Sequence, residues 1–322
     1  MKIKSILTAG VLAIAFTAIP CAQAAIYAAY ETNGGNAQGY VGKYDEITGA
    51  PIAGWTSPTQ GIPFCMTLSG NDLYVASTTF NTVLGGYTST LGRYDATTGA
   101  PIAGWTSSAG YGPVSIVRSG NYLYDTDSVS NTVHKYDAMT GAVIAGWVSP
   151  IGLNAPFALA TSGNYLYVTD SANNVSVVRK YDATTGAAIA GWNSPSGVSG
   201  PTALALSGNR LYVMNANNDT VGLYDATTGA TIAGWNSPSG VNYSRGMVTS
   251  GNHLWFANYG GNIEESDATT GATIASFNFN NPFIFNHGVT VAVSPASAPE
   301  PASTALLGLG MLLLGARRRR GA

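Results

Sequence analysis

Short segments of alternating apolar and polar residues run through most of this chain, and turn residues separate them. From residue 201, for example, the segments PTALAL (201–206), NRLYVMN (209–215), TVGLYD (220–225) and ATIAGW (230–235) follow one another. Segments of this length with a period of two predict β-strands, which we name A, B, C and D in chain order. Ser-Gly-Asn joins A to B and Asp-x-x-Thr-Gly joins C to D, and both sequences are typical of tight turns.

The four-strand unit repeats along the chain. KYDEITGAPIAGW at residue 43 returns as RYDATTGAPIAGW at 93, KYDAMTGAVIAGW at 135, KYDATTGAAIAGW at 180, LYDATTGATIAGW at 223 and ESDATTGATIASF at 265. Four strands in ~43 residues are the period of a β-propeller blade. The aspartate of the C–D turn recurs in every copy, so we interpret it as a turn cap that accepts backbone N–H bonds, not as a catalytic or metal-binding group. These aspartates are Asp45, Asp95, Asp137, Asp182, Asp225 and Asp267.

The two ends of the repeat region predict the number of blades. AIYAAY, from residue 25, matches a B strand, and GVTVAVS (288–294) matches an A strand with no B strand after it. The last strand can therefore complete the first blade and leave no open sheet edge. We expect an all-β domain over residues 25–294, a six-bladed β-propeller of four-stranded blades closed by the C-terminal strand.

The first 24 residues have the pattern of a secretory signal peptide. Lys2 and Lys4 precede an apolar run from residue 6 to 19, and the small residues Ala22 and Ala24 follow at the positions that signal peptidase reads. Cleavage after Ala24 leaves Cys65 as the one cysteine of the mature chain, so no internal disulfide is expected.

Residues 295–322 have the pattern of a membrane-associated tail. Pro299-Glu300-Pro301 precedes an uncharged stretch from 302 to 316, which would be about 22 Å long as a helix, short of the ~30 Å hydrocarbon core. We expect a short transmembrane segment, with the basic cluster that follows it in the cytoplasm and the preceding domain outside. The basic cluster consists of Arg317, Arg318, Arg319 and Arg320.

The proline-glutamate-proline triplet, apolar stretch and terminal arginines resemble the PEP-CTERM sorting signal of Gram-negative bacteria. The resemblance implies transient recognition by a membrane-embedded exosortase, transient anchoring in the inner membrane, removal of the tail, and delivery to the cell surface or the extracellular polysaccharide matrix. It covers about the last 25 residues, so it says nothing of the ligand.

The repeats resemble NHL and YVTN propeller repeats. The Asp-x-x-Thr-Gly turn is also similar to the quinoprotein repeat, but there the tryptophan lies four residues after the glycine, and here it lies six after it (Gly229 to Trp235). This departure favours a propeller without a quinone cofactor. We interpret the recurring D-strand aromatics as residues that pack between blades. They are Trp55, Trp105, Trp147, Trp192, Trp235 and Phe277.

Composition excludes one class of partner. Between residues 25 and 298 there are eight Lys and Arg and 15 Asp and Glu, a balance of −7, and the commonest residues are small, polar and uncharged. Such a domain has no basic patch for nucleic acid.

A search for catalytic or metal chemistry finds little. There is no nucleophile motif, no HExxH and no carboxylate pair at the ends of the A strands. His134, His253 and His287 lie at non-equivalent positions in different units, so we expect no shared metal site. Calcium is left as an alternative through carboxylates in and beside the B–C loops, although these lack an EF-hand pattern. These carboxylates are Asp125, Asp127, Asp170 and Asp219.

The D–A and B–C loops form the end of the propeller where we expect a ligand. Tyr111, Phe157 and Tyr243 offer aromatic faces that suit sugars, and Arg245 is the one charge in a D–A loop, interpreted either as solvated or as a grip on an anion. The leading hypothesis is a non-enzymatic surface or matrix protein that binds exopolysaccharide or another protein. The alternative is an exported metal-dependent hydrolase or lyase similar to gluconolactonase-like six-bladed propellers, and a third possibility is a mere spacer.

Overall fold

The computed structural model describes residues 25–31, 39–57, 61–81, 86–105, 107, 113–171, 176–259, 261–278 and 291–293. All of them belong to one compact unit, residues 24–295. The regular structure of these residues is entirely β, which confirms the expected all-β class. The signal peptide, the transmembrane segment and the sorting tail expected from the sequence lie outside the described residues.

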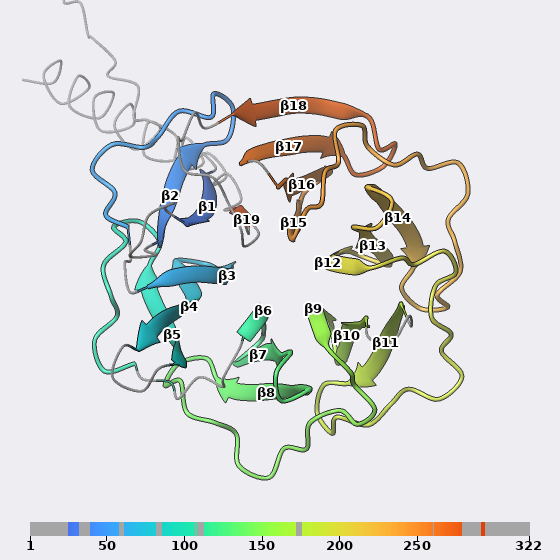
Figure 1. Ribbon diagram of the computed structural model, residues 1–322, viewed down its shortest axis with the longest axis horizontal. Helices are drawn as coiled ribbons and strands as arrows, with labels where there is room; N and C mark the ends of the chain where they lie inside the picture. Colours follow the sequence, from blue (N-terminus) through green and yellow to red (C-terminus); the bar gives the residue numbers. More distant parts are fainter. Residues whose placement is uncertain are drawn as a thin grey trace, which may run out of the picture. The chain divides into compact units, whose positions relative to one another are not determined.

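The described strands form six antiparallel sheets, numbered here in chain order and arranged around a common centre (Figure 1). Sheet 1 has β1 (Ala25–Glu31), β2 (Gly39–Asp45) and β19 (Val291–Val293), and sheet 2 has β3 (Ile62–Ser69), β4 (Asp72–Asn81) and β5 (Gly86–Asp95). Sheet 3 has β6 (Pro113–Ser119), β7 (Tyr122–Asp127) and β8 (Thr132–Asp137), and sheet 4 has β9 (Pro156–Ser162), β10 (Tyr165–Asp170) and β11 (Val177–Asp182). Sheet 5 has β12 (Pro201–Ser207), β13 (Arg210–Asn215) and β14 (Thr220–Asp225), and sheet 6 has β15 (Gly246–Ser250), β16 (His253–Ala257), β17 (Asn262–Asp267) and β18 (Thr273–Asn278). The predicted A strand is innermost in sheets 2 to 6, and β19 takes that place in sheet 1, paired with β1.

The prediction of four strands per unit was wrong for the described part of most sheets. Only sheet 6 has a D strand, β18; in the other five the D segment makes a single isolated bridge to strand C, such as Tyr224 to Thr231. The reason is a glycine three residues further on, Gly234 in sheet 5, which has a φ of 80° and turns the chain away from the sheet. Sheet 6 has Ser276 at this position, and its chain continues as a strand.

The six predicted cap aspartates occupy the same place in the C–D turns. In sheet 5, Asp225 Oδ1 accepts the N–H of Thr227 at 2.9 Å, the N–H of Thr228 at 2.7 Å and the Thr228 hydroxyl at 3.0 Å. These bonds favour the ionised carboxylate, and the backbone bond from Thr228 is the largest cause that lowers the pKa of Asp225. The arrangement recurs at the other five turns, so the repeated aspartate is accounted for by local structure.

The same turn also joins neighbouring sheets. In sheet 4, the Tyr167 hydroxyl, the Lys180 ammonium and the Trp192 indole N–H all donate to the carbonyl oxygen of Ala226 in the next sheet, at 2.8, 3.0 and 3.2 Å. The Tyr167 and Trp192 rings meet edge to face at 5.9 Å. Sheets 1 and 3 make the same three bonds to Ala96 and Ala183. The repeated tyrosine, lysine and tryptophan are therefore an inter-sheet clamp.

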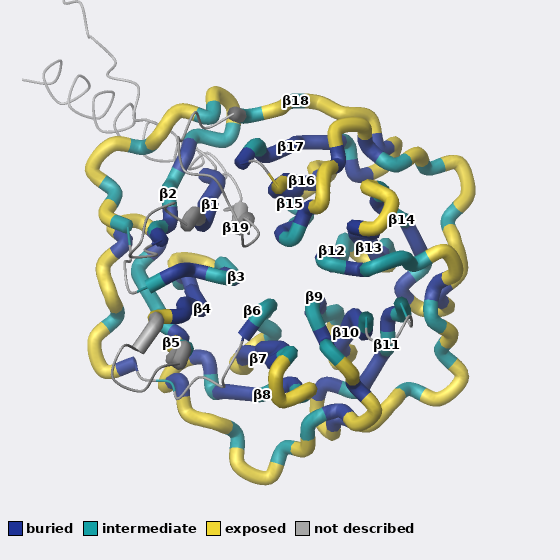
Figure 2. Tube along the Cα trace, viewed as in Figure 1, coloured by how far each residue is buried: buried dark blue, intermediate teal, exposed yellow. Residues whose placement is uncertain are grey.

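Burial follows this plan. Figure 2 shows buried residues along the strands and exposed residues along the turns and the outer segments. One apolar cluster lies between successive sheets; that of sheets 5 and 6, for example, includes Tyr212, Met214 and Phe256. Another includes Ile26 and Tyr44 of sheet 1 together with Trp255 and Ile263 of sheet 6. The first and last sheets thus share a core, as consecutive sheets do.

Candidate functional site

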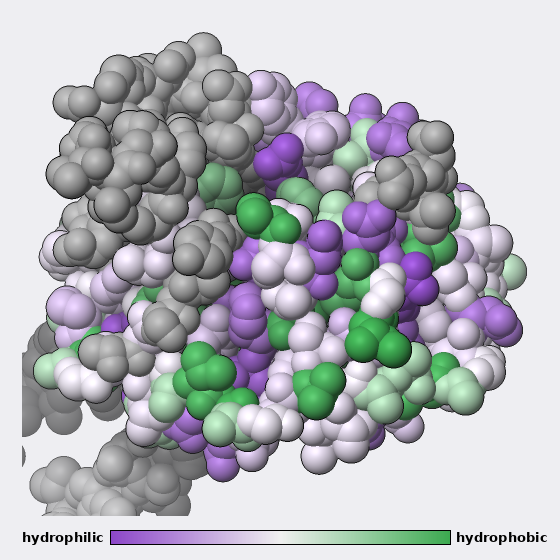
Figure 3. Space-filling view, turned by 60° about the horizontal axis from the view of Figure 1, so that its bottom comes forward, coloured by the Kyte–Doolittle hydropathy of each residue, from purple (hydrophilic) through white to green (hydrophobic). Residues whose placement is uncertain are grey.

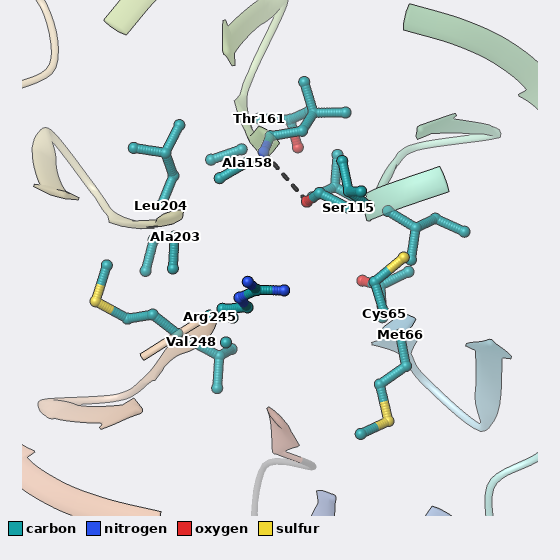
Figure 4. Close-up of a pocket in the computed structure, with 18 of the residues that line it drawn as sticks. Cys65, Met66, Ser115, Ala158, Thr161, Ala203, Leu204, Arg245 and Val248 are labelled. Atoms are coloured by element: carbon teal, nitrogen blue, oxygen red, sulfur yellow. Dashed lines mark hydrogen bonds between the residues drawn. The ribbon is translucent and has the colours of Figure 1, made fainter. Parts of the chain in front are cut away.

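A cavity of about 260 Å³ lies at the centre of the molecule, between the innermost strands. Its described walls are β3, β6, β9, β12 and β15, and the lining residues include two cations, Arg118 and Arg245, and no carboxylate. Arg118 pairs with Asp72, whose carboxylate lies 3.2 Å away and also pairs with Arg93. Arg245 extends toward the middle of the cavity (Figure 4).

Arg245 lies between two aromatic rings. Its guanidinium carbon is 5.4 Å from the ring centroid of Phe157, on β9 of sheet 4, and 5.4 Å from that of Tyr243, in the D–A loop before β15. The Arg245 Nε–H is buried and has no hydrogen-bond partner among the described residues. The structure therefore brings together three of the four ligand-face residues that the sequence predicted. The fourth, Tyr111, lies outside the described residues.

A second exposed tyrosine continues this cluster. Tyr243 and Tyr259 are 41% and 42% exposed and meet edge to face at 6.3 Å. Sequence reasoning did not select Tyr259, which follows strand B of sheet 6. The signal was present in the sequence: when the B strands are aligned, Asn258 of sheet 6 matches Asn215 of sheet 5, so Tyr259 stands where sheet 5 has Ala216.

Tyr243 has a strained backbone. Its φ is 41°, in the left-handed region where a bulky side chain is rare. Gly200 and Ala155 occupy the corresponding loop positions of sheets 5 and 4, with φ of 57° and 50°. The Asp219 carboxylate holds the strained residue by accepting its N–H at 2.7 Å. Strain of this kind persists where the surroundings impose it, and it is concentrated at functional sites.

The loop that carries Tyr243 and Arg245 is anchored by one buried amide. Asn258 Oδ1 accepts the backbone N–H of Asn242 at 3.0 Å and the hydroxyl of Ser244, and Asn258 Nδ2 donates to the Gly240 carbonyl at 2.8 Å. Asp170 and Asn215 hold the equivalent loops through one such bond each. Three hydrogen bonds to one buried side chain thus fix the D–A loop of sheet 6, where the other two sheets have one bond each.

The carboxylates considered for calcium are engaged with protein donors, and they are divided among sheets 3, 4 and 5. Asp170 accepts from the Asn154 N–H at 3.1 Å and from Arg179 at 2.7 Å, Asp127 accepts the N–H groups of Val129 and Ser130, and Asp219 accepts from Tyr243. Within the part of the chain that the structure describes, no three His, Cys, Asp or Glu side chains gather as a metal site would require.

Asp125 belongs to a different polar cluster, which the sequence did not predict. Its carboxylate is 1% exposed, lies 2.8 Å from His134 Nδ1 and accepts the Tyr136 hydroxyl at 3.0 Å, while His134 Nε2 is 3.2 Å from Thr132 Oγ1. The hydrogen bond to Asp125 is the largest cause that raises the pKa of His134.

The cluster replaces an apolar contact. In sheet 5 the residues paired in this register are Val213 and Gly222, and a Cβ on Gly222 would overlap the ring of Tyr224. Sheet 3 has Asp125 and His134 in these places. His253 makes a separate contact, with Glu265 at 2.6 Å, and His287 lies outside the described residues. The two described histidines therefore belong to different sheets.

Polar and apolar side chains are interspersed on the face shown in Figure 3. Separately, no helix among the described residues has the length and apolar character needed to cross a bilayer.

Two family models match the chain. One, described as the PEP-CTERM protein-sorting motif, matches residues 297–320, and one described as outer membrane protein assembly factor BamB matches residues 87–230. Among solved structures, a β-propeller chain of a nidogen/laminin complex matches with a TM-score of 0.62 and 15% identity, over 84% of this chain and 99% of that one. The computationally designed protein Ika8 matches with a TM-score of 0.48 and 18% identity, over 77% and 73%. None of the curated proteins compared with the chain matches it.

The radial sheets and the likeness to the nidogen-complex chain define the fold class as a β-propeller. The chain carries a PEP-CTERM sorting motif together with propeller repeats, and this motif indicates an exported protein that an exosortase processes.

Proposed function

We propose that this protein is a non-enzymatic binding module of the cell surface or extracellular matrix of a Gram-negative bacterium, and that its propeller binds exopolysaccharide. The observation that carries the proposal is the cluster at the end of the central cavity. Arg245 has a buried Nε–H with no partner among the described residues and contacts the Phe157 and Tyr243 rings, and the exposed Tyr259 ring meets that of Tyr243. Aromatic faces and hydrogen-bond donors at a concave site are the groups that bind sugars.

We further infer that the six sheets are six blades of a closed ring. Three observations support this inference. The terminal strand β19 pairs with β1, the innermost strands contact one another in the cyclic order β3, β6, β9, β12, β15, β19, and the first and last sheets share an apolar core. The contact of β19 with β3 completes that order.

The aromatic cluster and the last described strand lie at opposite ends of the sheets. Val293 pairs with Ile26, near the start of β1. This is the end of the sheet that carries the A–B turns elsewhere, as Ser207 and Arg210 show in sheet 5. Tyr243 and Arg245 lie at the other end, before the first residue of β15.

The test is binding of the exported mature protein to exopolysaccharide purified from the host, with metal content measured on the same sample. We expect saturable binding that is weakened at least tenfold by Phe157→Ala. Tyr165→Ala is the matched control, because Tyr165 is 40% exposed but lies at the A–B turn end. Absence of binding together with a stoichiometric metal would overturn the proposal and favour the metal-dependent hydrolase or lyase.

A protein ligand is the second outcome of the same test. The BamB-like match over residues 87–230 is the observation that favours it. Capture of a surface protein by the wild type and not by Phe157→Ala, without polysaccharide binding, would establish that alternative.

A further inference from the structure

The described lysines and arginines of the domain differ in whether the charged group has a partner within the protein. Arg93 and Arg118 pair with Asp72, Arg179 pairs with Asp170, and Arg210 bonds the Thr269 hydroxyl at 3.2 Å. The three described lysines each donate to a main-chain carbonyl of the next sheet, at 3.0 to 3.1 Å. Arg245 has neither an ion pair nor a hydrogen bond to the described residues.

The described residues around Arg245 contact its guanidinium but accept no hydrogen bond from it. The guanidinium carbon lies 5.4 Å from the ring centroids of Phe157 and Tyr243, and such contacts attract the cation but provide no in-plane acceptor for its N–H groups. The Nε–H has no partner among the described residues, and the described lining of the cavity has no carboxylate. A planar fork of N–H donors matches the two oxygens of a carboxylate in a bidentate pair.

The size and the neighbours of the site restrict the ligand further. A cavity of about 260 Å³ is below the ~300 Å³ at which pockets begin to enclose drug-sized molecules, so it suits one sugar unit, not a long segment. Tyr243, which contacts the arginine, and Tyr259, which contacts Tyr243, are exposed and offer rings for the apolar face of that unit. Without Arg245, residues 25–298 contain seven Lys and Arg and 15 Asp and Glu, a balance of −8, so the rest of the domain does not attract anions over long range.

From these observations we propose that the site binds a carboxylate-bearing sugar, a uronic acid unit of a polysaccharide. Its carboxylate pairs with Arg245, and its ring packs on Tyr243 and Tyr259. The inference rests on the proposed function and specifies its ligand class. An acidic peptide would supply the same carboxylate. We propose the polysaccharide because a sugar ring presents an apolar face to the exposed tyrosines together with hydroxyl groups for the polar loops.

The experiment compares two polymers with the same backbone, polygalacturonate and its methyl ester, as ligands of the exported mature protein. We expect polygalacturonate to bind at least tenfold more tightly than the ester, and less tightly as salt rises. Arg245→Gln should abolish this difference, and Arg245→Lys should restore part of it. Arg210→Gln is the matched control, because it also removes one arginine but at the A–B turn end. This variant should keep the wild-type preference for polygalacturonate over its methyl ester.

Each other outcome is decisive. Equal affinity for the acid and the ester, or an unchanged preference in Arg245→Gln, overturns the uronate inference. If both galacturonate polymers fail to bind while the host polysaccharide binds, the inference is overturned and the proposed function stands. If no polysaccharide binds and poly-glutamate does, both are overturned in favour of an acidic peptide.

Discussion

Replacing Tyr243 by glycine tests whether this tyrosine contributes to ligand binding or to the stability of the fold. The φ of 41° is natural for glycine, and relief of the left-handed strain should return about 1–2 kcal/mol of unfolding free energy. Against this, the variant loses the edge-to-face contact with Tyr259 and the contact with Arg245, each about 0.5 kcal/mol at such exposed positions. The greater freedom of glycine in the unfolded chain removes about 0.5–1 kcal/mol more. The sum is a change within about 1 kcal/mol of zero.

The matched variant is Tyr165→Gly. Tyr165 is 40% exposed and has Lys180 Nζ 4.2 Å from its ring centroid, so it resembles Tyr243 in exposure and in its cation contact. It lies on β10 with an ordinary strand backbone, so glycine relieves no strain there. The loss of strand preference, of the cation contact and of cross-strand packing should destabilise this variant by about 1–3 kcal/mol.

Chemical denaturation with urea measures both variants, and polysaccharide binding is measured on the same samples. We expect Tyr243→Gly to keep the wild-type unfolding free energy and to bind at least tenfold more weakly, and Tyr165→Gly to be destabilised and to bind normally. If Tyr243→Gly unfolds as readily as Tyr165→Gly and binds like the wild type, the argument from backbone strain to function is wrong.

Three further predictions test the inter-sheet clamp, the contact between His134 and the buried Asp125, and the sorting motif. Trp192→Phe removes an indole bond to Ala226 and should lower the unfolding free energy by about 1 kcal/mol more than Trp235→Phe, because the Trp235 indole N–H is buried without a partner among the described residues; equal losses in urea denaturation would count against the clamp. His134→Gln keeps a donor for Asp125 but does not titrate. Because the folded-state pKa of His134 is raised, with Asp125 and Asp127 as the neighbouring charges, the stability that the wild type has over this variant should be complete below ~6.5 and decrease as the pH rises through the folded pKa; a constant difference contradicts the assignment. Replacing Pro299, Glu300 and Pro301 by alanine should keep the protein in the membrane fraction with its tail attached, and release of a shortened protein, detected by intact mass, would refute the role of the motif.

Much of the fold could be predicted because its signals are local. An Asp-x-x-Thr-Gly turn forms its cap within four residues, and strand alternation is set by the backbone, so six copies of one unit predict the same turns and sheets. The error in the D strand was also local: Gly234 was counted as part of a strand although a glycine there permits the left-handed turn that ends it, and Ser276 marks the one copy that continues.

The repeat, its turns and the sorting motif could therefore be recognised in the sequence, since each depends on residues close together in the chain. Which side chains meet depends instead on how the sheets pack. Phe157 and Arg245 come from sheets 4 and 6, and their contact depends on the inward arrangement of the sheets around the cavity. Asp125 and His134 are opposite each other because of the strand register of sheet 3. Comparison with Val213 and Gly222, which hold the same positions in sheet 5, shows that this polar pair replaces an apolar one. The strand period and the turns are set by short segments, whereas the lack of a partner for Arg245 among the described residues depends on side chains that distant parts of the chain bring near it.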